Sequence, residues 1–158
     1  MSGTGIATSM PVGVARLDDL DAYQLAQEFK REVYRLIDAS PGALRDFKFR
    51  DQLRDSASGV ARNIGEGFRR FGAAEIAHFL NIALGSLAES EVNLVDGIDR
   101  RYFTRADCAA AFLLAKRCDK ATFNLHKSLQ PYIREKRGRP RRRSGPKGPG
   151  GPGGPGGP

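Results

Sequence analysis

The stretch "ASGVARNIGEGFRRFG", residues 57–72, decides how this chain folds. Its large apolar residues recur at the three- and four-residue steps that place them on one face of a helix. Three glycines interrupt that helical pattern: Gly59, Gly65 and Gly67. A glycine inside a helix costs about 1 kcal/mol relative to alanine, so we expect close packing against another helix to offset the cost.

Small and polar residues form a second stripe beside the apolar one, starting at Ser56. Small residues let two helix backbones approach closely, whereas a buried asparagine needs hydrogen-bond partners for its amide. We interpret the stripe as one side of a packing or oligomer seam in which Asn63 fixes the register. The seam residues are Asn63, Gly67, Gly85 and Ser86, the last two on the following apolar segment. A ligand contact by Asn63, Glu66 or Arg70 is the alternative that the sequence leaves open.

Outward from this stretch, apolar periodicity predicts four helices and no strand. The helices are expected over residues 17–39, 46–71, 74–98 and from 104 to about 131 or slightly beyond. Pro41 and Gly42 should separate the first two, Gly72 should cap the end of the second, and Thr104 with Asp107 should cap the start of the fourth. Short connections between such helices predict an all-α fold, an antiparallel up-down four-helix bundle.

The net charge of +8 is concentrated at the C-terminal end. Residues 134–158 carry eight basic residues and one acidic residue, which leaves a net charge of only +1 for the rest of the chain. Beyond Arg137 a basic run is followed by Gly-Pro repeats, which are typical of a flexible tail. We therefore predict a disordered lead-in over residues 1–16, the bundle domain over 17–134 and a disordered basic Gly/Pro-rich tail over 135–158.

The sequence offers little chemistry for catalysis. Glu75 and His78 form only half of the paired motif of di-iron bundles, so no metal is expected. No serine stands in a nucleophile elbow and no glycine-rich loop carries a phosphate-binding lysine, so we expect neither an enzyme nor a cofactor. No apolar run approaches the roughly 18 residues of a membrane span, and no signal peptide is evident. Cys108 and Cys118 lie too far apart on one helix to form a disulfide, and the expected compartment is the cytoplasm.

Basic residues remain as candidates for a binding surface. Cations of this kind bind the phosphates of nucleic acid without reading sequence. The candidates are Lys48, Arg54, Arg62, Arg69 and Arg70 on the second predicted helix, and Arg139, Arg141, Arg142 and Arg143 in the tail. A solvated helix face without a ligand is the alternative interpretation for the helical cations.

Two motifs carry a resemblance to a known family. "NIGEG", residues 63–67, resembles an Asn-Ile-Ala-Glu-Gly element, and "ALGSLAESE", residues 83–91, resembles an Ala-Arg-Gly-Ser-Leu-x-Glu element. Both elements are found in the four-helix bundle family first noticed in intervening sequences of bacterial 23S ribosomal RNA genes. The similarity spans about residues 20–132, with Gly65 in place of alanine and Leu84 in place of arginine.

The resemblance implies a small bacterial protein that assembles as a homopentamer. One branch of the family, the accessory variability proteins of diversity-generating retroelements, binds a reverse transcriptase and nucleic acid through a basic surface. A reverse transcriptase is therefore an expected partner only in a retroelement context, and Leu84 lacks the charge such a surface would use. The wide apolar surface of the third predicted helix is independently consistent with self-association.

These observations lead to two expectations. The first is a non-enzymatic, homo-oligomeric four-helix bundle that acts as a nucleic-acid-binding accessory protein through electrostatic, sequence-independent contacts with RNA or DNA. The second is a protein-interaction scaffold with no direct role in nucleic-acid binding.

Overall fold

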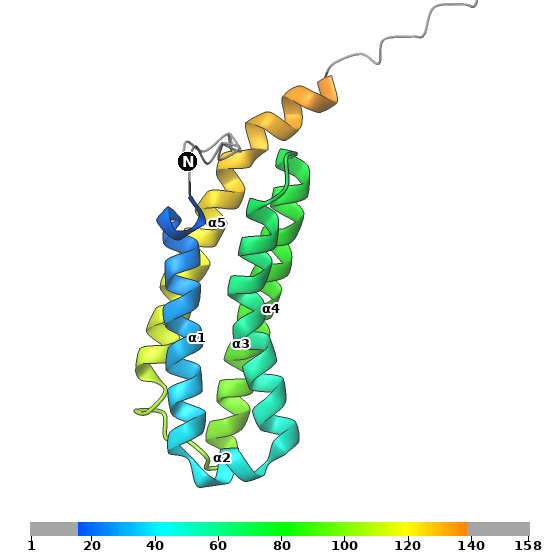
Figure 1. The fold of residues 1–158 in the computed structure, drawn as a ribbon. Helices are drawn as coiled ribbons and strands as arrows, with labels where there is room; N and C mark the ends of the chain where they lie inside the picture. Colours follow the sequence, from blue (N-terminus) through cyan, green and yellow to red (C-terminus); the bar gives the residue numbers. More distant parts are fainter. Residues whose placement is uncertain (1–15, 139–158) are drawn as a thin grey trace, which may run out of the picture.

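Four long helices make up most of the computed structural model, which describes the backbone of residues 16–138 and the side chains of 16–136 (Figure 1). The long helices are α1 (Asp21–Ala39), α3 (Phe47–Phe68), α4 (Ala73–Asp99) and α5 (Ala109–Gly138). A short 3-10 helix, η1 (Leu17–Asp19), precedes α1, and the short helix α2 (Pro41–Arg45) joins α1 to α3. The described residues contain no strand, so the predicted all-α class is confirmed.

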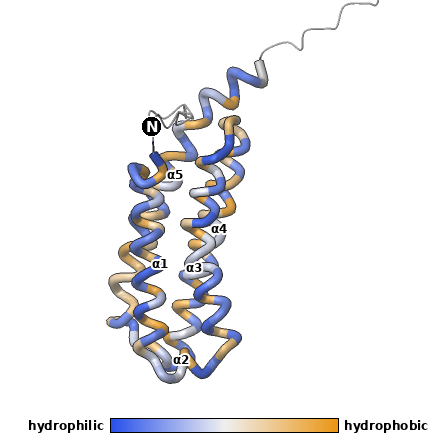
Figure 2. Tube along the Cα trace, in the orientation of Figure 1, coloured by the Kyte–Doolittle hydropathy of each residue, from blue (hydrophilic) through white to orange (hydrophobic). Residues whose placement is uncertain are grey.

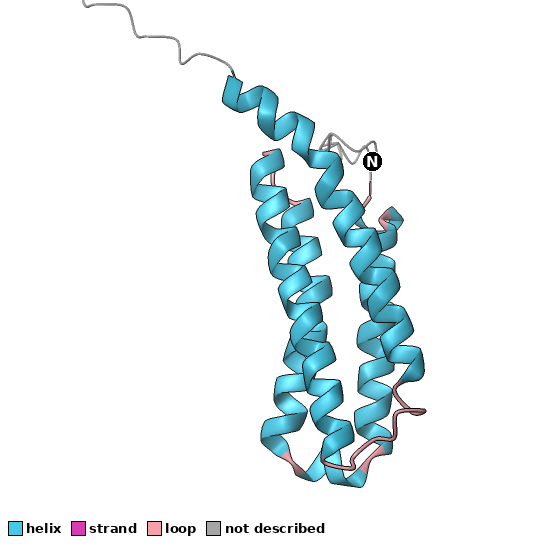
Figure 3. Ribbon diagram, turned by 180° about the vertical axis from the view of Figure 1, so that it is seen from behind, coloured by secondary structure: helices cyan, strands magenta, loops and turns pink. Residues whose placement is uncertain are grey.

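The long helices form an antiparallel up-down bundle, as the two opposite views show (Figures 1 and 3). The neighbouring pairs are α1 with α3, α3 with α4, α4 with α5, and α5 with α1. Helices α3 and α5 are therefore diagonal to each other, which places their outer surfaces on different sides of the bundle. Short connections between antiparallel neighbours produce this up-down order.

Two capping side chains set the helix boundaries in the first half of the chain, and these boundaries differ from the predicted ones. The Ser40 hydroxyl accepts a hydrogen bond from the Ala43 amide at 3.2 Å, and Pro41 occupies the start of α2, where a proline is tolerated. The Asp46 carboxylate then accepts from the Phe49 amide at 3.1 Å and caps α3. The predicted helix over residues 46–71 ends at Phe68, and Gly72 caps the start of α4, so its predicted role at the end of the previous helix is wrong.

The last helix starts later and ends later than predicted. Thr104 and Asp107 form the predicted reciprocal cap, with 2.8 Å and 3.1 Å hydrogen bonds, but the regular helix begins only at Ala109. Helix α5 then continues through Pro131 to Gly138 and extends beyond the other helices (Figure 1). Pro131 has no amide hydrogen to donate to the carbonyl oxygen of Lys127, one turn earlier. Both residues are exposed, so water can donate that hydrogen bond instead. Residues 135–138 thus belong to α5, while residues 1–15 and 139–158 of the predicted disordered ends lie outside the described residues.

The core lies along the axis of the bundle and is filled by aliphatic and aromatic side chains from all four long helices. Apolar and polar residues alternate along each helix, as expected for helices with one buried face (Figure 2). The largest fully buried side chains include Phe29, Leu53, Ile64, Leu80, Leu94 and Leu129. Burying a side chain of this size stabilises a fold by about 1.5–3 kcal/mol, so this apolar face is the main determinant of the bundle.

The two cysteines give a test of this core. Burial raises the pKa of both the Cys108 and the Cys118 thiols to about 11. We expect both thiols to react slowly with a thiol-specific reagent at about pH 8 in the folded protein and rapidly in denaturant, because the thiolate is the reactive form. Rapid labelling of the folded protein would contradict the described core.

The raised pKa values of the two thiols also predict how the free energy of unfolding changes at alkaline pH. The unfolded thiols release their protons near their ordinary pKa of 9.0, while the folded thiols hold them to about 11. Their contribution to the free energy of unfolding is therefore complete below about pH 9 and declines as the pH rises toward about 11. Denaturation measured across this pH range checks the decline.

Candidate nucleic-acid interface

Close packing between α3 and α4 accounts for two of the helical glycines. A Cβ atom built at Gly59 would lie 3.1 Å from the Ser86 hydroxyl oxygen. One built at Gly67 would lie 3.0 Å from the Phe79 Cβ and 3.4 Å from the Ile76 carbonyl oxygen. Gly67 and Ser86 therefore lie at the α3–α4 contact, as the predicted packing seam requires.

Serines, rather than Asn63, supply the buried polar contact of this seam. The Ser90 hydroxyl lies 3.0 Å from the Ser56 hydroxyl across the two helices, and Asn93 Nδ2 donates to Ser56 Oγ at 3.4 Å. Asn63 is only half-buried and donates to the Gly59 carbonyl of its own helix at 2.8 Å. Asn63 therefore does not supply the polar contact between α3 and α4, and its role in an oligomer seam stays a prediction; the missed signal is the pair of serines facing each other at this contact.

Gly85 lies on the outer surface of α4 and not in the bundle seam. No atom lies within 4 Å of a Cβ built at Gly85, which corrects the prediction that it packs within the bundle. Exposed apolar side chains lie on the same outer part of the helix: Ile82, Val92 and Val95. We call Ile82, Gly85, Val92 and Val95 the α4 apolar stripe.

Two of the predicted cations lie along one face of α3, and a third, Arg69, continues that line directly after the helix end. Lys48, Arg62 and Arg69 are separated by multiples of seven residues, and seven residues make about two helical turns. Lys48 and Arg69 form no side-chain ion pair within residues 16–136. Arg62 lies 3.4 Å from the Asp55 carboxylate, and both side chains are largely exposed. An exposed pair of this kind contributes little stability, so Arg62 remains available to a phosphate.

The other two helical candidates already have partners at the surface of the same chain. Arg54 donates to the Asp38 carboxylate at 2.6 Å and lies over the Tyr34 ring. Arg70 pairs with Glu66 and lies 4.9 Å from the centre of the Phe79 ring. Arg54 and Arg70 therefore hold neighbouring helices together and are less available than Arg62 and Arg69. The tail candidates Arg139, Arg141, Arg142 and Arg143 lie outside the described residues.

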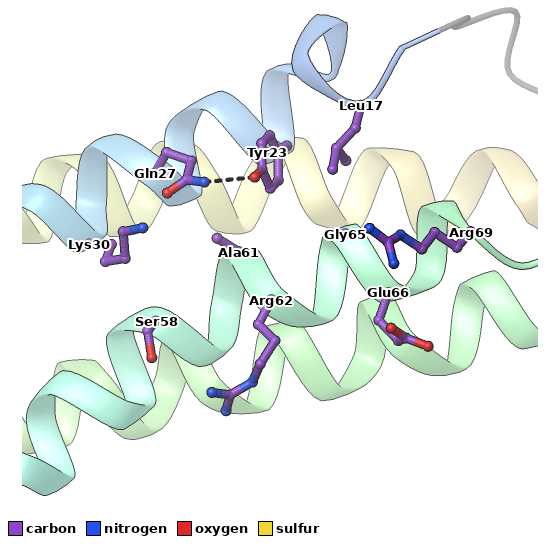
Figure 4. Close-up of a pocket in the computed structure, with 10 residues that line it drawn as sticks. All are labelled: Leu17, Tyr23, Gln27, Lys30, Ser58, Ala61, Arg62, Gly65, Glu66 and Arg69. Atoms are coloured by element: carbon purple, nitrogen blue, oxygen red, sulfur yellow. Dashed lines mark hydrogen bonds between the residues drawn. The ribbon is translucent and has the colours of Figure 1, made fainter. Parts of the chain in front are cut away.

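A groove of about 450 Å³ runs between α1 and α3 (Figure 4). Its α3 side is lined by Arg62 and Gly65 and by Arg69 just past the helix end, with the Arg62 side chain pointing away from α1 toward Asp55. Its α1 side carries Lys30 together with residues Tyr23 and Gln27, which the sequence reasoning missed. The steps of four and three from residue 23 to 27 to 30 place these polar side chains on one helix face, a signal that was present in the sequence.

The groove carries more positive than negative charge. Lys30, Arg62 and Arg69 supply three cations, while the acidic residue among the lining side chains, Glu66, pairs with Arg70. Lys30 forms no ion pair with any other described residue. An anionic ligand such as a phosphate diester would therefore meet partly unneutralised cations there.

Other kinds of site find less support in the described part of the chain. Within residues 16–136, no group of three or more histidine, cysteine, aspartate or glutamate side chains is placed to hold a metal ion. No helix of that part combines the length and apolar character needed to span a bilayer.

Fold and surface together define a small up-down four-helix bundle with a basic groove on one side and an apolar stripe on another. The model of the family described as 23S rRNA-intervening sequence protein matches residues 18–124. The chain belongs to this family, as its two sequence motifs indicated.

One solved structure that this chain matches is a protein with unknown function from the S23 ribosomal protein family of Bacteroides thetaiotaomicron VPI-5482. It is 22% identical to this chain, the alignment covers 71% of this chain and 97% of that one, and the TM-score is 0.49. No curated protein matches this chain.

Proposed function

We propose that this protein is a non-enzymatic, homo-oligomeric bundle that binds RNA or DNA through phosphate contacts without reading sequence. The observation that carries this proposal is the α1–α3 groove, whose lining includes Lys30, Arg62 and Arg69. Phosphate contacts made by lysine and arginine supply most of the affinity in sequence-independent binding. The arginines of residues 139–143 add further positive charge to the same chain.

Self-association is the second part of the proposal. The α4 apolar stripe leaves Val92 67% exposed and Val95 41% exposed, and a second copy of this chain would cover them. Five copies is the number that the family resemblance implies. A ring of copies would repeat the basic groove and so strengthen binding to a long nucleic acid through multivalency.

A titration tests the nucleic-acid proposal. A labelled structured RNA is titrated with the full chain and with a chain ending at Gly138, the last residue of α5, and fluorescence anisotropy is recorded across a salt series. If the groove supplies three phosphate contacts, the logarithm of the affinity of the shorter chain should fall with the logarithm of salt concentration with a slope of about −2 to −3. Light scattering on the same samples gives the number of copies.

Each result has a definite meaning. Binding by both chains supports the groove as a nucleic-acid surface. Binding by the full chain alone would assign the interaction to residues 139–158 and contradict the groove. Absence of binding by either chain, even at low salt, would contradict the first function.

The alternative function is a protein-interaction scaffold. The observation that favours it is the same α4 apolar stripe, because exposed apolar surface on a helix suits protein partners as well as self-association. A reverse transcriptase is the proposed protein partner only if the gene lies in a retroelement. Assembly without any nucleic-acid affinity in the titration above would favour the scaffold.

A further inference from the structure

Two hydrogen-bonding groups of the α1–α3 groove are incompletely used. Gln27 Nε2 donates to the Tyr23 hydroxyl oxygen at 2.7 Å, which leaves the Tyr23 phenol proton free to donate. Gln27 Oε1 is buried and has no hydrogen-bond partner among the described residues. Because buried polar atoms are normally paired, an unpaired acceptor beside a free donor indicates where a ligand can complete the hydrogen bonds.

The cations of the groove lie beside these two groups. Lys30 is one helical turn beyond Gln27 on α1, and Arg69 lies at the other end of the groove, just past the end of α3, whereas the Arg62 side chain points away from α1 (Figure 4). A suitable ligand therefore combines a flat edge of donors and acceptors with an anionic group. An unpaired nucleotide has this combination, since its base exposes hydrogen-bonding edges and its phosphate is anionic.

We infer that the α1–α3 groove binds one unpaired nucleotide of a single strand, with its base beside Tyr23 and Gln27 and its two flanking phosphates toward Lys30 at one end of the groove and Arg69 at the other. The base donates to Gln27 Oε1 and accepts from the Tyr23 hydroxyl. Gln27 Oε1 is buried, so it reaches the base only when the amide rotates about its soft last side-chain torsion, and this rotation replaces the hydrogen bond to Tyr23 by one to the base. This inference rests on the proposed nucleic-acid function and specifies the form of nucleic acid that the groove selects.

The dimensions of the groove favour a single strand over a duplex. A surface groove of about 450 Å³ along α1 and α3 can take one flat base, whereas a double helix is too wide to enter it. In a duplex the edges that pair bases are already occupied, and only the phosphates could reach Arg62 and Arg69. A volume of about 450 Å³ lies within the range of small-ligand pockets.

The first test compares strands and variants with the full chain. Fluorescence anisotropy is recorded for a labelled single-stranded RNA of about ten nucleotides and for its duplex, each at the same salt concentration. The single strand should bind at least about 5-fold more tightly than the duplex, and Tyr23→Ala should weaken single-strand binding by about 10-fold. Gln27→Leu should weaken single-strand binding in the same direction, whereas neither variant should change duplex binding.

Two further variants serve as controls for the aromatic ring. Tyr23→Phe keeps the ring and removes the hydroxyl, so it should retain more single-strand affinity than Tyr23→Ala. Phe123→Ala removes an exposed aromatic side chain from α5, which is diagonal to α3, and should leave single-strand binding unchanged. Helical circular dichroism of every variant shows that a change in affinity does not come from unfolding.

A photochemical test uses a single nucleotide, so its result does not depend on the binding of an RNA strand. 4-Thiouridine monophosphate is cross-linked to the full chain by light, and tryptic peptides are identified by mass spectrometry. The peptide of residues 17–30 contains both Tyr23 and Gln27 and should carry the nucleotide. An excess of uridine monophosphate should compete, while inorganic phosphate at the same concentration should compete less.

The results separate this inference from the proposed function. Equal affinity for strand and duplex, with no effect of Tyr23→Ala, would overturn the nucleotide site and leave phosphate-based binding in place. If no RNA binds, the proposed function fails, and the cross-link then decides the groove: a labelled 17–30 peptide supports a nucleotide site, and an unlabelled one overturns it.

Discussion

Gly97→Leu is expected to lower the free energy of unfolding by about 3 kcal/mol, because α4 has no room for a side chain at this position. A Cβ atom built at Gly97 would lie 2.7 Å from the Phe103 ring and 2.8 Å from the Phe49 ring. Both rings are about 95% buried and cannot swing out to solvent. Urea denaturation followed by helical circular dichroism measures the change.

Gly85→Ala is the matched control for this substitution. Gly85 is also an interior residue of α4, but no atom lies within 4 Å of a Cβ built there. Since alanine favours a helix over glycine by about 1 kcal/mol, this variant should be as stable as the parent chain or more stable. Equal changes in the free energy of unfolding for the two substitutions would show that the effect at Gly97 comes from helix propensity and not from contact with Phe49 and Phe103. Both variants are compared at one protein concentration, because assembly would otherwise shift the apparent stability.

The double charge reversal Arg62→Glu with Arg69→Glu is expected to weaken RNA binding by about 100-fold at low salt, equal to about 2.7 kcal/mol. Each reversal removes a cation from the groove and adds repulsion toward phosphate. Loss of two phosphate contacts should also make the slope of the logarithm of affinity against the logarithm of salt less steep by about 2. Anisotropy of the chain ending at Gly138 measures both effects without the contribution of residues 139–158.

The control reversal is Lys116→Glu with Lys120→Glu on α5. Both lysines are exposed, and α5 is diagonal to α3 in the bundle. The two double variants have the same net charge, so a general effect of charge would weaken binding equally in both. A reduction confined to the Arg62 and Arg69 variant locates binding at the groove, and equal reductions would contradict that location.

The sequence predicted the architecture well because helical periodicity and short connections depend on local residues. It placed the apolar face of α3 and the Thr104–Asp107 cap correctly. It failed at Gly72 and Pro131, where the position of a helix end depends on which backbone groups remain accessible to water or to caps. Where these helices end therefore depends on tertiary contacts, and these contacts cannot be read from the residues of one segment alone.

The candidate site was only partly predictable for a related reason. Sequence identified Arg62 and Arg69 as cations on one helix, but it could not show that Arg54 and Arg70 already have partners in Asp38 and Glu66. The α1 half of the groove was missed because facing residues on α1 and α3 are far apart in the chain. Asn63 was overvalued because an asparagine in a helix can satisfy its amide on its own backbone, as it does here.

The contact between Ser56 and Ser90 has a consequence for how the basic groove on α3 is positioned relative to the outer side of α4. These hydroxyls are buried, and sliding α4 along α3 by one turn, about 5.4 Å, would separate them. This contact therefore favours one register of α4 along α3. If a second copy of this chain binds to the outer side of α4, the cations of α3 in the two copies would lie at a fixed distance from each other. Assembly would then set the spacing at which successive grooves contact a nucleic-acid strand.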